Sequence, residues 1–266
     1  MTKLQNKIVW ITGASSGIGE ALVYQLSKEK ANLIISARRK RELGRVKNSC
    51  PSESQKNIHI LPLDLSQPDS LKLMSEAAIN YYGRIDILIN NGGVSQRSLA
   101  KETLMEVDRQ IMEVNYFSAV ALTKNLLPGM IENKSGHIVT MSSILGKFGV
   151  SMGSGYCASK HALHGFFDAL RIEHWRDNIK ITLICPGYID TNVSLNALTA
   201  DGSKYDKLTK GQVNGMPAEV CARKIVKAIK REKEEIYLGG SELSGVYVKR
   251  YFPGFFTWYM KRFKLR

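Results

Sequence analysis

The chain has 266 residues, of which 44% are hydrophobic and 23% charged, which excludes the low-hydrophobicity composition of a disordered chain. This length is sufficient for one large α/β domain, and nothing in the composition requires a second one. The formal net charge of +14 leaves three kinds of partner open, namely nucleic acid, an anionic membrane and an anionic small molecule.

The N-terminal residues, the cysteines and the histidines indicate a cytoplasmic protein without a metal site. The first apolar run, 8–11, leads directly into a glycine-rich turn, so neither a signal peptide nor an N-terminal anchor is expected. The four cysteines are widely spaced and form no Cys-x-x-Cys pair, which fits a reducing compartment. His161 and His164 have no acidic or thiol partner beside them at ligand spacing, so no metal is expected.

Short β-branched apolar runs alternate with longer segments of helical periodicity, as is typical of βαβ units. The expected strands are 7–12, 32–37, 57–62, 85–90, 136–141, 180–185 and 235–238. The expected helices lie near 18–29, 68–82, 102–133, 154–176 and 217–232, the last with Pro217 in its first turn. The pattern predicts a single α/β domain with a doubly wound sheet of seven mostly parallel strands and helices on both faces.

A glycine-rich turn joins the first expected strand to the first expected helix, which is the context of a dinucleotide-binding fingerprint. Gly13 permits the tight turn, Gly17 lets the backbone approach a pyrophosphate, and Gly19 allows close contact between helix and sheet. Free amide groups at the start of the helix attract the anion. The residues of this turn that we expect at the cofactor are Gly13, Ser15, Ser16, Gly17, Ile18 and Gly19.

The residues after the second expected strand favour NADP(H) over NAD(H). Enzymes that use NAD usually carry an acidic residue about 20 positions beyond the glycine turn, where it binds the ribose hydroxyls. This chain has Arg38 and Arg39 there, and guanidinium groups bind a phosphate bidentately. The alternative is that the basic run 38–41 is only the solvated start of a helix.

A tyrosine and a lysine share one face of the expected helix 154–176. Tyr156 and Lys160 are four positions apart, so both reach a common ligand. A nearby ammonium lowers the pKa of a tyrosine and makes it a usable acid or base at neutral pH. Ser143 lies at the end of the fifth expected strand, where parallel sheets bind ligands, and its hydroxyl is expected to hold the substrate oxygen.

The sequence resembles the short-chain dehydrogenase/reductase family, in the branch with a Tyr-x-x-x-Lys active site. The resemblance covers about residues 5 to 240 and implies a Rossmann-like sheet and hydride transfer between a nicotinamide and a carbonyl or secondary alcohol. It implies that Ser143 positions this group, Tyr156 transfers a proton, Lys160 binds the nicotinamide ribose and Asn115 holds a water. The matching segments are Thr12 to Gly19, Asp64-Leu65, Asn90 to Gly93, Asn115, Ser142-Ser143, Tyr156 to Lys160, Pro186-Gly187 and Thr191.

The same resemblance places further residues at the cofactor. Asp64 faces the adenine and Asn91 the adenosine side, while Ile189 and Thr191 face the nicotinamide carboxamide. The other cofactor-binding residues that it implies are Leu65, Gly92 and Gly187. Gly92 stands where the family usually has alanine, a change small enough to leave cofactor binding credible.

Two features are similar to the 11β-hydroxysteroid-dehydrogenase-like branch of the family, which includes dehydrogenase/reductase member 7 proteins. They are the Ser-Ser-x-x-Gly-Lys stretch at 142–147 and the aromatic, basic C-terminus. This similarity suggests a lipophilic ketone, aldehyde or hydroxysteroid-like substrate. The family resemblance also implies a homodimer or homotetramer formed through helices 102–133 and 154–176.

The last 21 residues combine aromatic and basic side chains and contain no acidic one. The uncharged run 251–260 is too short to cross a bilayer, which takes about 20 residues. Such a segment suits peripheral contact with an anionic membrane. The alternative is that its rings pack over the substrate-binding cleft or against another subunit. Nucleic-acid binding is not expected, because the chain offers no recognition module beyond its charge. The aromatic residues are Tyr247, Tyr251, Phe252, Phe255, Phe256, Trp258, Tyr259 and Phe263.

The chain therefore divides into a dinucleotide-binding catalytic domain, 1–245, and an aromatic basic C-terminal segment, 246–266. Within the domain, 189–215 has little periodicity and is expected to be a long substrate-binding loop. The main alternative to an enzyme is a non-catalytic NADPH-binding regulator or membrane-associated scaffold with the same fold. The intact set of Ser143, Tyr156, Lys160 and Asn115 argues against that alternative.

Overall fold

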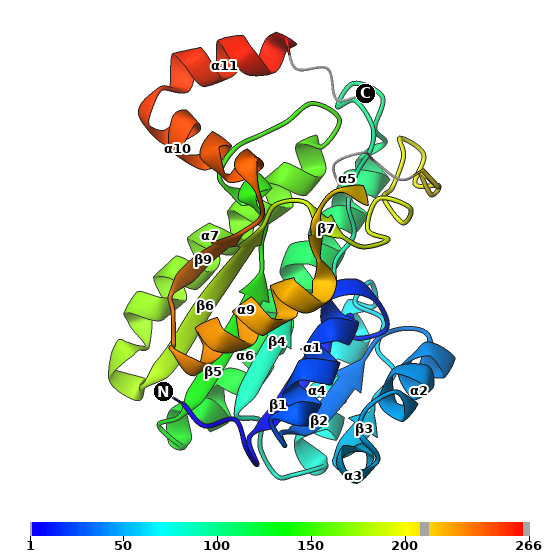
Figure 1. Cartoon of the computed structure of the whole chain (residues 1–266), viewed down its shortest axis with the longest axis vertical. Helices are drawn as coiled ribbons and strands as arrows, with labels where there is room; N and C mark the ends of the chain where they lie inside the picture. The colour runs from blue at the N-terminus through cyan, green and yellow to red at the C-terminus, as the bar shows by residue number, and fades with distance from the viewer. Residues whose placement is uncertain (1, 208–212, 263–266) are drawn as a thin grey trace.

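The computed structural model describes residues 2–207 and 213–262 and contains a seven-stranded sheet covered by helices on both faces (Figure 1). The strands run in the order β3-β2-β1-β4-β5-β6-β9, and every neighbouring pair is parallel. This is a Rossmann-like fold, as expected, with a parallel arrangement throughout. The strands are β1 Ile8–Thr12, β2 Asn32–Ser36, β3 Ile58–Ile60, β4 Ile87–Asn90, β5 Gly136–Met141, β6 Ile179–Pro186 and β9 Glu235–Leu238.

The helices lie between the strands and beyond the last one. A π-helix, η1 (Glu113–Phe117), joins α5 to α6, and three short 3-10 helices are η2 (Ile144–Gly146), η3 (Trp175–Asp177) and η4 (Ser241–Leu243). The α-helices are α1 Gly17–Lys28, α2 Lys40–Asn48, α3 Ser52–Gln55, α4 Pro68–Asn80, α5 Met105–Met112, α6 Ser118–Glu132, α7 Ser154–Glu173, α9 Ala218–Lys230, α10 Ser244–Tyr251 and α11 Pro253–Arg262.

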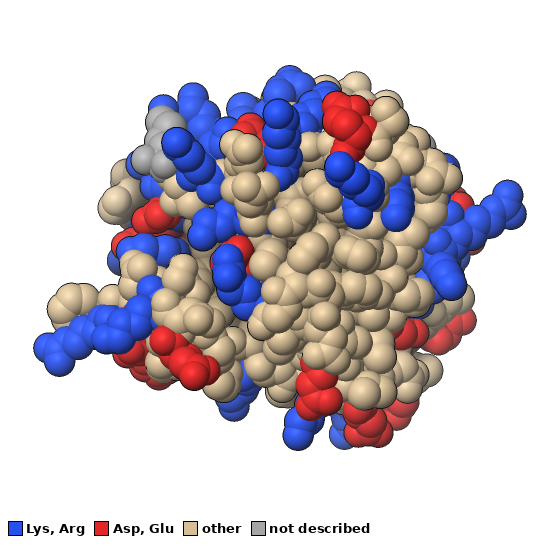
Figure 2. Space-filling model, turned by 90° about the horizontal axis from the view of Figure 1, so that it is seen from below, with Lys and Arg blue, Asp and Glu red and all other residues tan. Residues whose placement is uncertain are grey.

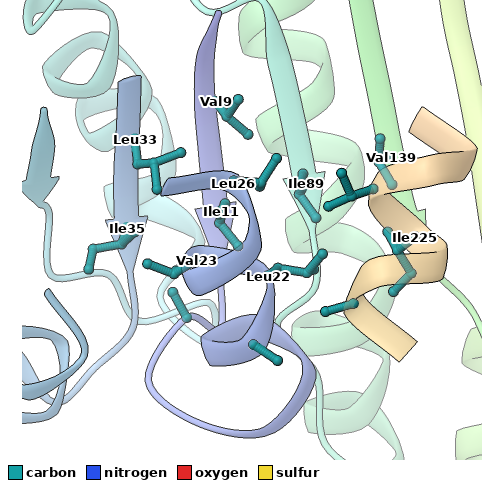
Figure 3. Packing of buried hydrophobic residues seen from close by; sticks show 14 of the residues in the cluster. Val9, Ile11, Leu22, Val23, Leu26, Leu33, Ile35, Ile89, Val139 and Ile225 are labelled. Carbon is teal, nitrogen blue, oxygen red and sulfur yellow. The ribbon is translucent and has the colours of Figure 1, made fainter. Parts of the chain in front are cut away.

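Two apolar layers hold the sheet between its helices. On one face Val9 and Ile11 of β1 pack beneath α1 and α9, and Figure 3 shows Leu22 of α1 and Ile225 of α9 reaching the same layer. On the other face Trp10 of β1 belongs to the layer beneath α4, α6 and α7. Successive side chains of a strand point to opposite faces. A strand covered on both faces is therefore apolar at most of its positions, which is why the sequence reads as nearly continuous apolar runs.

Several expected elements differ from the observed ones. The expected helix 102–133 is three elements, because α5 begins at Met105 and the π-turn of η1 separates it from α6. The expected helix 154–176 ends at Glu173. Pro217 caps α9 from the position before its first residue instead of lying within its first turn. Helices α2 and α3 were not among the expected helices. Their stripe of buried apolar residues is too short to be recognised in the sequence, since α2 buries only Leu43 and Val46.

The expected loop 189–215 contains short paired segments in its described part. Residues Ile189–Asp190 form β7, which pairs in parallel with β8, Met216–Pro217. Leu198 makes isolated bridges to Gln96 and Lys204. Residues 208–212 of this loop lie outside the described residues.

The aromatic C-terminus forms two helices, α10 and α11, at one end of the molecule (Figure 1). Val246 and Phe256 anchor them on Ile144 and Phe148 in a small apolar cluster. Phe263, Lys264 and Arg266 lie outside the described residues. In the part of the chain that the structure describes, no helix is both long and apolar enough to span a bilayer.

The end of the molecule opposite α10 and α11 carries charges of both signs (Figure 2). Lys and Arg side chains lie mainly around the rim of this face with Asp and Glu between them, and its centre is largely uncharged. A polyanion bound through its backbone needs a continuous run of cations. On this face Asp and Glu side chains and uncharged surface lie among the cations.

Candidate active site

The glycine turn has the geometry that dinucleotide binding requires. Gly13 has a φ of +64° and approaches the chain after β4 so closely that a Cβ atom there would lie 2.7 Å from the Cα atom of Gly92. The amide of Asn91 donates hydrogen bonds to the carbonyls of Thr12 at 2.9 Å and Gly13 at 3.1 Å. Asn91, which the family resemblance assigns to the adenosine side of the cofactor, therefore also holds the turn in place.

The start of α1 is open to an anion. The helix begins at Gly17 (φ +56°), and its N-cap Ser16 makes no side-chain hydrogen bond to the first turn. The N–H groups of that first turn have no partner within the helix. Ser15 and Ile18 belong to the same turn, and Gly19 packs so tightly against the carbonyl of Gly13 that a side chain would collide with it. This geometry suits a pyrophosphate.

The end of β2 lies beside this turn, because the N–H of Ala14 donates to the carbonyl of Ser36 at 3.0 Å. Arg38 and Arg39 follow in the connection to α2 and are exposed. Within the described chain neither guanidinium makes an ion pair or a side-chain hydrogen bond. A third arginine, Arg45, forms ion pairs with Glu20 at 2.8 Å and with Glu42 at 2.9 Å. Arg38 and Arg39 therefore lie beside the turn without a counter-charge in the described chain.

Asp64 and Leu65 follow β3, next to the glycine turn. One carboxylate oxygen of Asp64 accepts hydrogen bonds from the N–H of Ser66 at 3.0 Å and from its hydroxyl at 2.8 Å, which orients the carboxylate. The side chain of Leu65 occupies the space into which a Cβ atom at position 92 would project. The departure from the family alanine at Gly92 thus makes room for Leu65.

A cavity of about 140 Å³ at the carboxyl ends of β4, β5 and β6 brings many expected residues together. Its walls also include residues that the sequence did not single out, among them Val94, Met141 and Val193. No residue type marks these positions, since they line the cavity through their place in the fold. The expected residues in its walls are Ile18, Asn91, Ser143, Tyr156, Lys160, Gly187, Ile189 and Thr191.

Burial dominates the acid–base properties of the helical pair. It raises the pKa of the Tyr156 hydroxyl to about 12, against the smaller opposing effect of a hydrogen bond with Ser143. It lowers the pKa of the Lys160 ammonium to about 8. The expected lowering of the tyrosine pKa by lysine is absent here, because the Lys160 Nζ atom donates to the Met141 carbonyl at 2.8 Å. Nζ also lies 5.6 Å from the centre of the Tyr156 ring.

Asn115 lies in η1, outside the walls of the 140 Å³ cavity. Its side chain accepts a hydrogen bond from the Val94 N–H at 2.8 Å and donates to the Val94 carbonyl at 2.9 Å and the Ser159 hydroxyl at 3.0 Å. A Cβ atom at Gly93 would stand 3.0 Å from the Asn115 Oδ1 atom and 3.7 Å from the Lys160 Nζ atom. The glycine therefore leaves space between the amide and the ammonium.

A larger cavity of about 660 Å³ adjoins the first one. Ser143 and Tyr156 line both cavities. The wall formed by α10 and α11 includes Phe255, Phe256 and Met260. The C-terminal helices thus pack over the cleft, which was one of the alternatives for this segment.

One group of three potential metal ligands occurs among the described residues, His164, Cys185 and Glu235, with ligand atoms within 4.8 Å of one another. The Cys185 Sγ atom faces Nε2 of the imidazole at 3.7 Å, whereas the Glu235 carboxylate faces Nδ1 at 3.4 Å. The carboxylate also binds the Lys147 ammonium at 2.8 Å. The two partners face opposite ring nitrogens, which does not suit binding to a single ion.

A parallel sheet with a glycine turn and a Ser-Tyr-Lys set at its carboxyl edge defines a nucleotide-binding oxidoreductase. The sequence profile of the family described as short chain dehydrogenase matches residues 7–201. The chain therefore belongs to the short-chain dehydrogenase/reductase family, and it is an oxidoreductase.

Similar proteins from animals extend this relationship over nearly the whole chain. A dehydrogenase/reductase SDR family protein 7-like of Anopheles gambiae is 44% identical over 264 residues, covering 97% of this chain and 83% of its own length. Dehydrogenase/reductase SDR family member 7 of Homo sapiens is 43% identical, covering 96% of this chain and 77% of its own. The similarity to member 7 proteins is confirmed.

Solved structures share the fold. A short-chain dehydrogenase from Streptomyces avermitilis has a TM-score of 0.81 at 28% identity and covers 96% of this chain and 97% of its own. A short-chain dehydrogenase/reductase from Burkholderia phymatum in complex with NAD has a TM-score of 0.82 at 20% identity, and the match covers 94% of this chain and 95% of its own. An alcohol dehydrogenase from the archaeon Thermococcus sibiricus, complexed with 5-hydroxy-NADP, has a TM-score of 0.77 at 22% identity, and the match covers 88% of this chain and 97% of its own. At these identities the last two show the fold alone.

Proposed function

We propose that the protein is an NADP(H)-dependent oxidoreductase that acts on the carbonyl or secondary alcohol of a lipophilic ketone, aldehyde or hydroxysteroid-like substrate. The observation that carries this proposal is the position of Ser143 and Tyr156 in the walls of both cavities. The smaller cavity adjoins the glycine turn and suits the nicotinamide end of a cofactor. The larger is walled by aromatic side chains and suits an apolar substrate. A carbonyl screen with NADPH and NADH in parallel tests the proposal, and a chain that binds NADPH without oxidising it would instead be a regulator or scaffold.

The proposed chemistry follows from the hydroxyls at this junction. The Ser143 Oγ atom accepts a hydrogen bond from the Leu145 N–H at 3.1 Å, and its hydroxyl donates to the Pro186 carbonyl at 3.3 Å. When the substrate binds, this hydroxyl turns from the Pro186 carbonyl to the substrate oxygen. With a pKa of about 12, Tyr156 is protonated at neutral pH and acts as the general acid of carbonyl reduction. The bound cofactor supplies the hydride. Lys160 binds the nicotinamide ribose, and the space at Gly93 suits a water between Lys160 and Asn115.

The proposed preference for NADP(H) rests on the free guanidinium groups beside the glycine turn. Replacing Arg38 with aspartate is expected to raise the Kd for NADPH by about 10- to 100-fold, because a charge-assisted bond to the 2′-phosphate is lost. Binding of NADH should change much less. Titrations monitored by nucleotide fluorescence measure both constants, with the exposed Arg231→Asp as control for the charge change. Equal weakening of both nucleotides would contradict the preference.

We also propose peripheral contact with an anionic membrane through the C-terminal segment, 246–266. The exposed fractions are 71% for Tyr251, 66% for Phe252 and 52% for Trp258, which is unusual for aromatic side chains. Arg262 lies over the Trp258 ring at 4.1 Å, and the described part of the segment contains no acidic residue. Exposed rings flanked by cations are typical of side chains that lie at the lipid headgroups. The proposed division of the chain therefore sets this segment apart from the catalytic domain, 1–245.

Vesicle co-sedimentation tests this contact. The protein is expected to sediment with vesicles containing phosphatidylserine at low salt, and the double variant Trp258→Ser, Arg262→Ser to bind about 10-fold more weakly, since it loses an aromatic anchor and a cation. Trp175 and Arg176 form a second exposed pair with the cation 5.1 Å from the ring, so their serine variants are a matched control. Wild-type protein that ignores these vesicles would rule out membrane contact.

The proposed homodimer or homotetramer is supported by apolar side chains exposed on the helices expected to form it. Phe117, between α5 and α6, is 51% exposed, and Ile172 of α7 is 74% exposed. The variant Phe117→Ser, Ile172→Ser is expected to shift the protein toward the monomer, because it removes apolar surface from both helices. Sedimentation velocity measures the shift. A wild-type monomer at micromolar concentration would contradict the proposal.

A cytoplasmic location remains part of the proposed function. The cysteines Cys50, Cys157, Cys185 and Cys221 are buried free thiols. Unpaired thiols are the usual state in a reducing compartment, which supports this location.

A further inference from the structure

The 660 Å³ cavity has two charged side chains in its described walls, one of each sign. Glu242 is bound by the main chain, because its Oε1 atom accepts hydrogen bonds from the N–H groups of Tyr188 at 2.9 Å and Gly240 at 3.1 Å. Arg97 is half-buried, and within the described chain its guanidinium has no ion pair and no hydrogen bond. Within the described chain the Glu242 carboxylate is therefore satisfied by main-chain N–H groups, whereas the Arg97 guanidinium has no partner.

The backbone of Arg97 is fixed relative to the catalytic tyrosine. Its own N–H donates to the Leu198 carbonyl at 2.8 Å. The preceding residue, Gln96, is buried, and its Oε1 atom accepts a hydrogen bond from the Tyr156 N–H at 3.2 Å. Gln96 also binds the Ser98 hydroxyl at 3.2 Å. Arg97 therefore reaches the cavity from a segment that is attached directly to the first turn of α7.

The rest of the cavity is largely apolar and aromatic, with Phe148, Phe255 and Phe256 among its walls. An unpaired cation in such surroundings has lost part of its hydration without gaining a partner. A guanidinium pairs with a carboxylate through two parallel hydrogen bonds, a geometry that the ammonium of lysine does not provide. The missing counter-charge can be supplied by the substrate.

We propose that the substrate is amphipathic: an apolar oxo or hydroxy compound that carries a carboxylate, which pairs with Arg97 while the reacting carbon lies at Ser143 and Tyr156. This inference rests on the proposed function and narrows its substrate class. In this proposal Arg97 contacts the carboxylate of the substrate and not the reacting carbon. It therefore acts on the affinity for the substrate and on the choice among substrates.

A matched pair of substrates tests the proposal, namely a long-chain oxo acid and its methyl ester, which differ only in the charge. Wild-type protein is expected to favour the acid. In Arg97→Gln the acid-to-ester ratio of kcat/KM is expected to fall by about 10- to 100-fold, mainly through KM of the acid, because a hydrogen-bonded charge pair is lost. Arg97→Lys restores part of the ratio. The control variant Arg223→Gln removes an exposed arginine of α9 outside the cavity walls and is expected to leave the acid-to-ester ratio unchanged.

A calorimetric titration with the saturated fatty acid of the same length provides a readout without turnover, in which Arg97→Gln should weaken binding by a similar factor. If both substrates are reduced and the ratio is the same in Arg97→Gln and wild type, the carboxylate assignment is overturned and the proposed function stands. If neither substrate nor any other carbonyl is reduced with NADPH, the proposed function itself is overturned.

Discussion

Replacing Tyr156 with phenylalanine is expected to lower kcat for carbonyl reduction by about 10²- to 10⁴-fold, the usual contribution of a positioned general acid. The hydroxyl lies where the two cavities meet, and burial keeps it protonated at neutral pH. Removing it eliminates the proton that the substrate oxygen takes up as hydride arrives. The ring remains, so the Kd for NADPH should change by less than about twofold. Stopped-flow measurement of a single turnover separates the chemical step from product release.

Tyr82→Phe is the control for loss of a partly buried tyrosine hydroxyl. Tyr82 donates to the Asn57 carbonyl at 3.3 Å, and burial raises its pKa as well, but it is absent from the walls of both cavities. Its removal should leave kcat unchanged. If Tyr156→Phe also keeps the wild-type kcat, the catalytic assignment is wrong and a non-catalytic role for the Ser-Tyr-Lys set would have to be considered.

The strands could be predicted because the physics that buries them is local to the sequence. The ranges 136–141 and 235–238 match β5 and β9 to the residue, and the other strands differ by one or two positions at their ends. Both faces of the inner strands are covered, so most of their side chains are apolar, and such runs are visible without knowledge of their partners. The ends of strands depend on which neighbour continues the ladder, which a single sequence does not contain.

Other features depend on distant packing and could not be predicted. The π-helix η1 has no residue signature, since a single-turn bulge arises where the helix adjusts to its neighbours. In α11 only Phe256 is buried, so there is no apolar stripe to detect. The pKa of Tyr156 was expected to be lowered by Lys160, but burial raises it, and the Lys160 ammonium binds the Met141 carbonyl instead. Burial is a property of the whole fold, whereas the spacing of Tyr156 and Lys160 is a property of one helix.

The two cavities explain why cofactor chemistry was easier to infer than substrate chemistry. The proposed cofactor residues include those that follow β1, β2 and β4, at positions that a parallel sheet fixes through its topology. The larger cavity instead combines walls from α10 and α11 with the segment around Arg97, which are far apart in the sequence. Neither carries a motif. Arg97, the charged side chain of this cavity that has no hydrogen-bond partner within the described chain, became apparent only when these segments were seen together.

Replacing Lys160 with methionine is expected to lower kcat/KM for reduction by about 100-fold or more, since the ribose and the proton relay lose a charged donor. The same substitution should change the pH dependence of the rate of reduction. The pKa of Lys160 is about 8, so the wild-type ammonium loses its proton as pH rises through this value, and the rate of reduction falls on the alkaline side. Tyr156 does not contribute to this decline, because its pKa of about 12 keeps it protonated. In Lys160→Met the alkaline decline should be absent.

Stability provides a second test of the same ammonium, independent of turnover. Its pKa is about 8 in the folded chain and 10.5 in the unfolded one, so between these values the unfolded chain binds more protons. The stability of the wild type should therefore gain a contribution of about 2 kcal/mol from Lys160 between about pH 8 and about pH 10, and Lys160→Met should lack it. The other lysines titrate in both proteins and cancel in the difference. Urea unfolding of the two proteins at both pH values measures the gain, and a constant difference in stability would show that Lys160 is not held in the buried state described here.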